Sequence, residues 1–114
     1  MEKDVAGKLG ELAEACRKKR ISELKEMGED LAEEAFLKNE PRLLDSVIVA
    51  YAAAKFLEKP DVLRSPAWKP FFAELLEKIE GSAKALDNEP EYAYELLHAA
   101  VESIRRCRPS TTRR

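Results

Sequence analysis

Residues 43–57 read LLDSVIVAYAAAKFL, and the architecture expected of the whole chain follows from this stretch. Its clearly polar side chains are Asp45, Ser46 and Lys55. A helix that is apolar on nearly every side has to be surrounded by other elements, because no face of it would be stable in water. Its length of roughly 22 Å is too short to cross a membrane. We therefore predict the buried central helix of a water-soluble bundle, with Ile48 and Val49 in the core.

Proline residues mark the helix ends on either side of this stretch. Asn39 can cap the central helix, and Pro41 suits its first turn, where the missing N–H leaves no bond unmade. Pro60 ends the central helix. The connector that follows, residues 61–69, is expected to hold one short helical turn, and Pro66 marks the start of the next helix.

The tripeptide Asn-Glu-Pro occurs at residues 39–41 and again at 88–90, each time between two helical patterns. This repetition suggests two helical hairpins of similar plan. A last apolar stripe follows the second tripeptide and ends at Pro109. We therefore predict an all-α fold, an antiparallel bundle of four or five helices built from two helical hairpins around a buried central helix. Residues 1–108 form the single domain, and residues 109–114 form a flexible basic tail.

Residues 4–38 contain no proline and repeat apolar side chains close to every 3.6 residues. The period is interrupted only at Arg20, so this segment is either one long helix or two helices that meet near residues 18–20. We favour a long or kinked helix, whose first half would extend beyond the bundle and expose an apolar strip. The strip consists of Val5, Leu9, Leu12 and Cys16. Because monomeric proteins seldom expose such a strip, we predict a homodimer in which Val5, Leu9 and Leu12 bind the partner.

The composition is that of a helix-rich protein with a charge-dense surface, at 45% hydrophobic and 37% charged residues among 114. The net charge of −2 hides an asymmetry, because residues 105–114 hold arginines and no acid. No apolar run of the signal-peptide type begins the chain, and no stretch is long enough to span a bilayer. We expect a cytoplasmic protein without membrane contact. Cys16 and Cys107 are expected to be reduced, the alternative being a disulfide that joins the two ends of the chain.

His98 is the only histidine, and Glu95 precedes it with the Glu-x-x-His spacing that places both side chains on one helix face. Di-iron carboxylate bundles use this spacing, but they need two such motifs and two further glutamates. One chain supplies half of that set, so a metal site would require a dimer axis beside His98. We expect a solvent-exposed polar flank with no metal or cofactor, and Glu95 and His98 are the candidates if a metal binds.

Motifs of hydrolytic and group-transfer enzymes do not occur in the chain. It has no G-x-S-x-G, no glycine-rich phosphate loop, no H-E-x-x-H and no calcium-binding loop. A single histidine and the absence of a reactive-cysteine context leave little for nucleophilic catalysis. We therefore expect that the protein is not an enzyme.

Two basic clusters are candidates for nucleic-acid contact, because phosphate binding needs clustered positive charge. One is the Lys-Lys-Arg sequence at residues 18–20. The other comprises Arg105, Arg106, Arg108, Arg113 and Arg114. The acidic body of the chain and the lack of aromatic residues among the basic ones argue against this function. Nucleic-acid binding through the C-terminal tail is therefore an alternative and not the main prediction.

Trp68, Phe71 and Phe72 lie within one helical turn and cannot all face the same way. Exposed aromatic side chains at the start of a helix are typical anchors for a protein partner, so Trp68 and Phe71 are candidate partner-binding residues. The alternative, to which we give equal weight, is that residues 59–70 fold back over them.

Together these patterns favour a small, non-enzymatic helical interaction or assembly protein that self-associates. One alternative is a nucleic-acid-associated protein that uses the basic tail. A second is a dimeric metal-binding bundle that uses His98.

Overall fold

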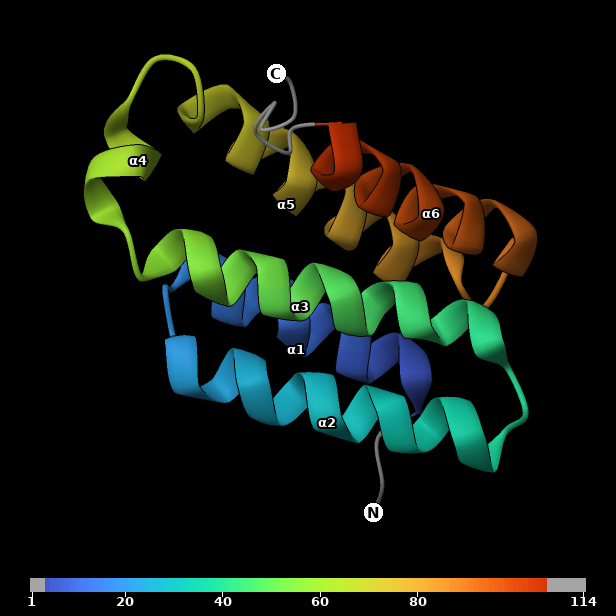
Figure 1. Cartoon of the computed structure of the whole chain (residues 1–114). Coiled ribbons are helices and arrows are strands. Elements are labelled where there is room, and N and C mark those ends of the chain that lie inside the picture. The colour runs from blue at the N-terminus through green and yellow to red at the C-terminus, as the bar shows by residue number, and fades with distance from the viewer. Residues whose placement is uncertain (1–3, 107–114) are drawn as a thin grey trace.

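The computed structural model describes residues 4–106, and every regular element in this range is a helix (Figure 1). In chain order the elements are α1 (Val5–Arg17), α2 (Ile21–Leu37), the 3-10 helix η1 (Pro41–Leu43), α3 (Leu44–Leu57), α4 (Pro60–Arg64), α5 (Lys69–Ala85) and α6 (Pro90–Arg106). The predicted all-α class is confirmed. None of the helices described is both long and apolar enough to cross a membrane. The predicted tail, together with Cys107 and Pro109, lies outside the described residues.

Four of the helices form two packed pairs, α2 with α3 and α5 with α6, and α1 and the short α4 connect these pairs (Figure 1). The two helices of each pair run in opposite directions (Figure 1). α1 lies behind α3 and packs against both α2 and α5, while α3 also contacts α6. The short α4 bridges α3 and α5 at one end of the molecule, so the core lies between the two pairs.

The N-terminal segment is two helices, α1 and α2, joined by a sharp turn at residues 18–20. Two hydrogen bonds close α1 in the Schellman pattern. The Lys19 N–H donates to the Cys16 carbonyl at 3.2 Å, and the Arg20 N–H donates to the Ala15 carbonyl at 2.9 Å. Lys19 has a φ of 59°, in the left-handed region that glycine and asparagine usually occupy. The long helix that we favoured is therefore wrong, and the alternative of two helices is confirmed.

The turn folds α1 back onto the chain and buries the strip that we expected to contact a second copy. Leu9 and Leu12 are fully buried, and Val5 is 8% exposed. α2 and α5 cover α1 from two sides. The expectation that Val5, Leu9 and Leu12 form an exposed partner-binding strip is therefore wrong, because one chain covers these residues by itself.

The central helix α3 is buried on one side only. Its buried residues are Ser46, Val49, Ala50, Ala53, Ala54 and Leu57. On the other side, Ile48 is 46% exposed and Tyr51 is 41% exposed. The burial expected of Val49 is confirmed, whereas that expected of Ile48 is wrong. α1 has as many buried residues as the longer α3, so α3 is not the single most buried element.

Small side chains let α2 and α3 approach each other closely. A Cβ atom placed on Gly28 of α2 would lie 3.3 Å from Cζ of Tyr51 and 3.6 Å from Cβ of Ala50. The first distance is tighter than ordinary van der Waals contact, so an alanine here would require the Tyr51 ring to shift by a few tenths of an ångström. The Tyr51 ring therefore packs over the backbone of α2 at Gly28.

Asn39 ends α2 instead of capping the central helix. It has a φ of 51°, and its N–H donates to the Phe36 carbonyl at 3.2 Å. The cap of the following turn is Glu40, whose carboxylate accepts a hydrogen bond from the Arg42 N–H at 3.3 Å. The capping role predicted for Asn39 is therefore wrong, although this segment does separate two helices as expected.

The two Asn-Glu-Pro segments meet in space through Arg42. Its guanidinium donates to the Glu91 carboxylate at 2.9 Å, one residue beyond the second tripeptide. Arg42 also donates to Glu40 at 2.7 Å, and this bond holds the pKa of the Glu40 carboxyl below its usual range. The guanidinium lies 4.3 Å from the centre of the Tyr94 ring, a cation–π contact. Arg42 thus links η1 to the start of α6.

Val49→Asp and Ile48→Asp are a matched pair of substitutions, because they place the same charge at neighbouring positions of α3. We expect Val49→Asp to unfold the protein, since it buries an unpaired carboxylate in a domain with a total stability of about 5–15 kcal/mol. Ile48→Asp should stay folded and melt less than about 8 °C lower, as expected of a surface change. Melting followed by circular dichroism checks both, and a cooperatively melting Val49→Asp variant would contradict the role of α3 in the core.

Candidate functional site

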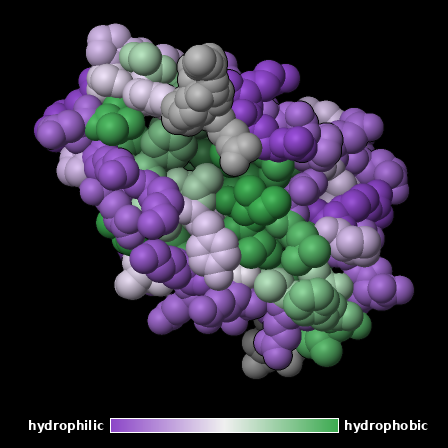
Figure 2. All heavy atoms as spheres, in the orientation of Figure 1, coloured by the Kyte–Doolittle hydropathy of each residue, from purple (hydrophilic) through white to green (hydrophobic). Residues whose placement is uncertain are grey.

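Large apolar side chains are exposed over the end of α2 and along α3. Phe36 and Leu37 are 74% and 75% exposed, and Ile48 and Tyr51 lie one turn apart on α3. We call these four residues the apolar face. Figure 2 shows a hydrophobic band on this side of the molecule, with hydrophilic residues on both flanks. Monomeric proteins seldom leave a large contiguous apolar surface exposed unless it has a binding role.

Charged side chains of opposite sign stand at the two ends of the exposed side of α3. The Lys55 side chain, one turn beyond Tyr51, is 76% exposed, and its ammonium lies 3.9 Å from the Glu58 carboxylate. Asp45, whose side chain is 24% exposed, lies almost one turn before Ile48, at the opposite end. The exposed side of α3 therefore has a basic end and an acidic end.

His98 lies beside the acidic end, where α6 meets α3. Its Nδ1 is 3.5 Å from a carboxylate oxygen of Asp45, and its Nε2 is 3.7 Å from one of Glu102. These contacts become ion pairs when the imidazole is protonated. The His98 side chain is 65% exposed, so the exposed flank that we expected is what the structure shows. The contact with Asp45 was missed, because nothing in the sequence pairs one position of α3 with one of α6.

Glu95 and His98 do not belong to a larger group of potential metal ligands within residues 4–106. Glu95 and His98 line a shallow hollow of about 380 Å³ together with Arg42 and Asp45. No group of three or more potential ligands among residues 4–106 is arranged to hold a metal ion. The side chains around this hollow form exposed ion pairs that connect η1, α3 and α6.

Trp68 and Phe71 are half-buried in a cluster of aromatic rings around Phe56 of α3. The ring centre of Phe56 lies 5.4 Å from that of Trp68 and 5.5 Å from that of Phe71. Trp68 and Phe71 meet edge to face at 5.5 Å. The Phe72 ring lies 6.2 Å from Phe56. The cluster fastens α5 to the end of α3, so Trp68 and Phe71 have a packing role in addition to any role in binding a partner.

Acidic neighbours accompany most of the predicted basic residues in the described range. Lys18 lies 2.8 Å from Glu14, and Arg20 lies 3.4 Å from Glu23. Arg105, near the end of α6, donates to Glu102 at 3.1 Å, and Arg106 is exposed beside it. The remaining predicted residues, Arg108, Arg113 and Arg114, lie outside the described range. Lys19 differs from its two neighbours, because no acidic side chain of residues 4–106 pairs with it.

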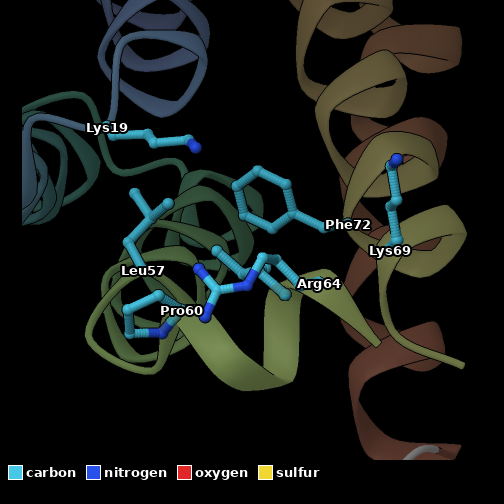
Figure 3. A pocket seen from close by; sticks show the side chains of 7 residues that line it. Lys19, Leu57, Pro60, Arg64, Lys69 and Phe72 are labelled. Atoms are coloured by element: carbon cyan, nitrogen blue, oxygen red, sulfur yellow. The ribbon is translucent and has the colours of Figure 1, made fainter. Parts of the chain in front are cut away.

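A hollow of about 600 Å³ opens between the end of α3, α4 and the start of α5 (Figure 3). Apolar and basic side chains line it, and none of the lining residues is acidic. They are Lys19, Leu57, Pro60, Leu63, Arg64, Lys69 and Phe72. The sequence did not reveal this hollow, because its lining comes from four segments of the chain.

The thiol of Cys16 is free and buried. Burial raises its pKa to about 12, since the apolar surroundings disfavour the thiolate, and the nearby Arg17 only partly opposes this effect. A thiol of this kind is almost entirely protonated at neutral pH and is a poor nucleophile. Cys16 therefore contributes to the core and offers no reactive group.

Comparison of the chain with known protein families, curated protein sequences and solved structures finds no match.

Replacing His98 with alanine tests whether its contacts with Asp45 and Glu102 are structurally important. Because exposed ion pairs contribute only about 0.2–1 kcal/mol, we expect the melting temperature of His98→Ala to stay within about 6 °C of the wild type. Metal analysis of both purified proteins should give the same content. A metal that is lost only from His98→Ala would contradict the exposed-flank interpretation.

Proposed function

We propose that the chain is a small, non-enzymatic helical protein that works by self-association, as a dimer paired through the apolar face. The exposure of Ile48 and Tyr51 on α3, with Phe36 and Leu37 at the end of α2, supports this proposal. Full burial of one large apolar side chain is worth roughly 1.5–3 kcal/mol. Each of the four is already partly covered and contributes less than that, but both copies in a symmetric pair contribute the same set.

Two-fold symmetry is the simplest way for one surface to cover itself, because each copy presents the same patch to the other. An axis between Ile48 and Tyr51 would set the two α3 helices side by side in opposite directions. Ile48 of one copy then meets Tyr51 of the other. Ala52, which is half-buried on the same side of α3, is small enough to let the helices approach closely.

Charge supports the same arrangement. In the two-fold pairing, Lys55 of each copy comes near Asp45 of the other copy, so opposite charges meet at both ends of the interface. Complementary charges at the edge of an interface favour the correct register and speed association. A parallel arrangement of the two α3 helices would instead place like charges together.

The apolar face is carried by the packed helices of the bundle. We take it to be an antiparallel bundle built from two helical hairpins, α2–α3 and α5–α6, with α1 packed between them. Such a framework holds the exposed side chains on rigid helices, so little conformational entropy is lost when they are covered.

The other candidate functions have less support from the described residues. Two of the three basic residues at 18–20 have acidic neighbours, and His98 faces only two carboxylates. Nucleic-acid binding by Arg108, Arg113 and Arg114 stays a prediction, as does the binding of a protein partner by Trp68 and Phe71.

Light scattering or sedimentation over a series of micromolar concentrations tests the dimer. We expect a mass near twice the 12.9 kDa of one chain. Ile48→Asp and Tyr51→Asp should each raise the dissociation constant at least about tenfold, because each places an unpaired charge in the interface twice. Both variants should keep the circular dichroism spectrum of the wild type. A mass near 12.9 kDa at every concentration would overturn the proposal.

Charge exchange provides the control for register. Lys55→Glu and Asp45→Lys should each weaken the dimer, and the double variant should recover most of the loss. Lys84→Glu, an exposed change on α5, should leave the dissociation constant unchanged within about twofold, as expected of a charge outside the interface. Equal effects of Lys55→Glu and Lys84→Glu would contradict the antiparallel pairing of α3.

A further inference from the structure

The hollow between α3, α4 and α5 combines an apolar wall with a concentration of positive charge. Leu57 ends α3, Leu63 belongs to α4 and Phe72 to α5, so three helices supply the apolar part. Figure 3 shows the Phe72 ring pointing into the hollow, toward Leu57 and Pro60. A volume of about 600 Å³ lies within the range of small-molecule sites, roughly 300–1,000 Å³.

The wall behind the hollow is held in place by aromatic contacts. Phe72 packs on Phe56, which also meets Trp68 and Phe71. These contacts join α3 to α5 through Phe72, which also lines the hollow. Because the wall is already packed without a ligand, a molecule entering the hollow would not have to order it, and preformed sites bind with a smaller loss of entropy.

Three cations line the hollow, and two of them have no charged partner within residues 4–106. Lys19 comes from the turn between α1 and α2, and its ammonium points across the hollow (Figure 3). Lys69, at the start of α5, also lines the hollow, but its side chain runs along α5 on the far side of Phe72 (Figure 3). Neither forms an ion pair with a described residue. Their neighbours in the sequence show a contrast, since Lys18 and Arg20 both lie beside glutamates.

The third cation, Arg64, lies over the opening between Pro60 and Phe72 (Figure 3). It donates to Asp61 at 2.5 Å, but the two side chains are 72% and 95% exposed. Such an exposed pair is weak and readily exchanges its carboxylate for another. Asp61 does not line the hollow, and like charges gathered around an empty space repel one another. An anion placed there would relieve this repulsion.

We propose that the hollow binds a small amphipathic anion, a molecule with an alkyl or aryl body and one carboxylate or sulfonate group. The apolar body would lie against Leu57, Leu63 and Phe72, and the anionic group would lie between Lys19 and Arg64, with Lys69 adding positive charge at the rim beyond Phe72 (Figure 3). A bare inorganic anion would leave the apolar wall in water, and a neutral apolar molecule would leave the cations unpaired. The occupant is a dissolved single molecule, because the site is a hollow between helices and not a flat surface.

Calorimetric titration with octanoate and with 1-octanol tests the proposal, because the two probes share a chain length and differ in charge. Octanoate should bind with a stoichiometry of one and at least about tenfold more tightly than 1-octanol, if three exposed charges each give about two- to fivefold. Octanoate should also displace the fluorescent aryl sulfonate 1-anilinonaphthalene-8-sulfonate. Equal affinity for octanoate and 1-octanol would overturn the proposal, as would binding to anionic phospholipid vesicles without binding of octanoate.

A triple variant locates the anionic group. Lys19→Asn keeps a residue that accepts the left-handed backbone, and Arg64→Gln with Lys69→Gln removes the other two charges. This variant should bind octanoate at least about tenfold more weakly than the wild type, and its affinity for 1-octanol should be unchanged. The matched control, Lys38→Gln with Lys84→Gln and Arg105→Gln, makes the same change in net charge elsewhere and should keep octanoate affinity within about twofold. Equal losses in the two triple variants, or no loss in the first, would overturn the assignment.

Two further variants separate the hollow from the apolar face. Leu63→Trp fills the hollow and should abolish octanoate binding while the circular dichroism spectrum is retained. Ile48→Asp alters the apolar face and should leave octanoate affinity unchanged. Octanoate binding that is lost in Ile48→Asp and kept in the triple variant at the hollow would place the ligand on the apolar face and overturn the proposal.

Discussion

The close packing of the small residues of α3 is the constraint on which the rest of the structure depends. Ala50, Ala53 and Ala54 are at most 1% exposed, and Gly28 of α2 continues the same close contact from the opposite helix. The inward side of α3 carries these alanines together with Val49 and Leu57, and the opposite side carries Ile48 and Tyr51. Ile48 and Tyr51 are therefore exposed because of how the core is built, and the apolar face follows from the same arrangement.

The sequence predicted most of the helices but not the directions in which they face. Prolines and the Asn-Glu-Pro tripeptides placed the starts of α3 and α6 correctly to within a few residues. The turn at residues 18–20 was only the less favoured alternative, because Lys19 occupies a left-handed position where glycine or asparagine would have marked it. The orientation of α3 was missed for a different reason. A helix with apolar residues all around has no polar stripe to show which side meets the core.

Neither the hollow nor the contact of His98 with Asp45 could have been predicted from the sequence, because each depends on how distant segments of the chain meet. The hollow requires the α1–α2 turn to bring Lys19 toward the end of α3, and that turn was itself only the less favoured of two predictions. The contact of His98 with Asp45 likewise requires the packing of α6 on α3. Periodicity identifies the residues that share one helix face, but it contains no information on which faces of different helices are neighbours.

Ion pairs between helices reinforce this arrangement from outside. They are Lys8 with Glu34, Arg17 with Glu80, Lys25 with Glu58 and Arg42 with Glu91. The hydrogen bond from Lys8 holds the pKa of the Glu34 carboxyl below its usual range. Because surface ion pairs add little to stability, their main effect is on the register in which helices meet. Each of the four links a different pair of segments, so together they disfavour other ways of packing the same apolar stripes.

The position of Trp68 affects how the unfolding of this protein would be observed. It is the only tryptophan, and it lies at the corner where α4 joins α5. α4 has no buried residue, and segments with few buried contacts open at a lower free energy than the core. Because Trp68 belongs to the aromatic cluster that joins α5 to Phe56 of α3, its fluorescence would follow the separation of α3 from α5 and not the detachment of α4. An early opening of α4 would therefore pass largely unseen in a fluorescence melt.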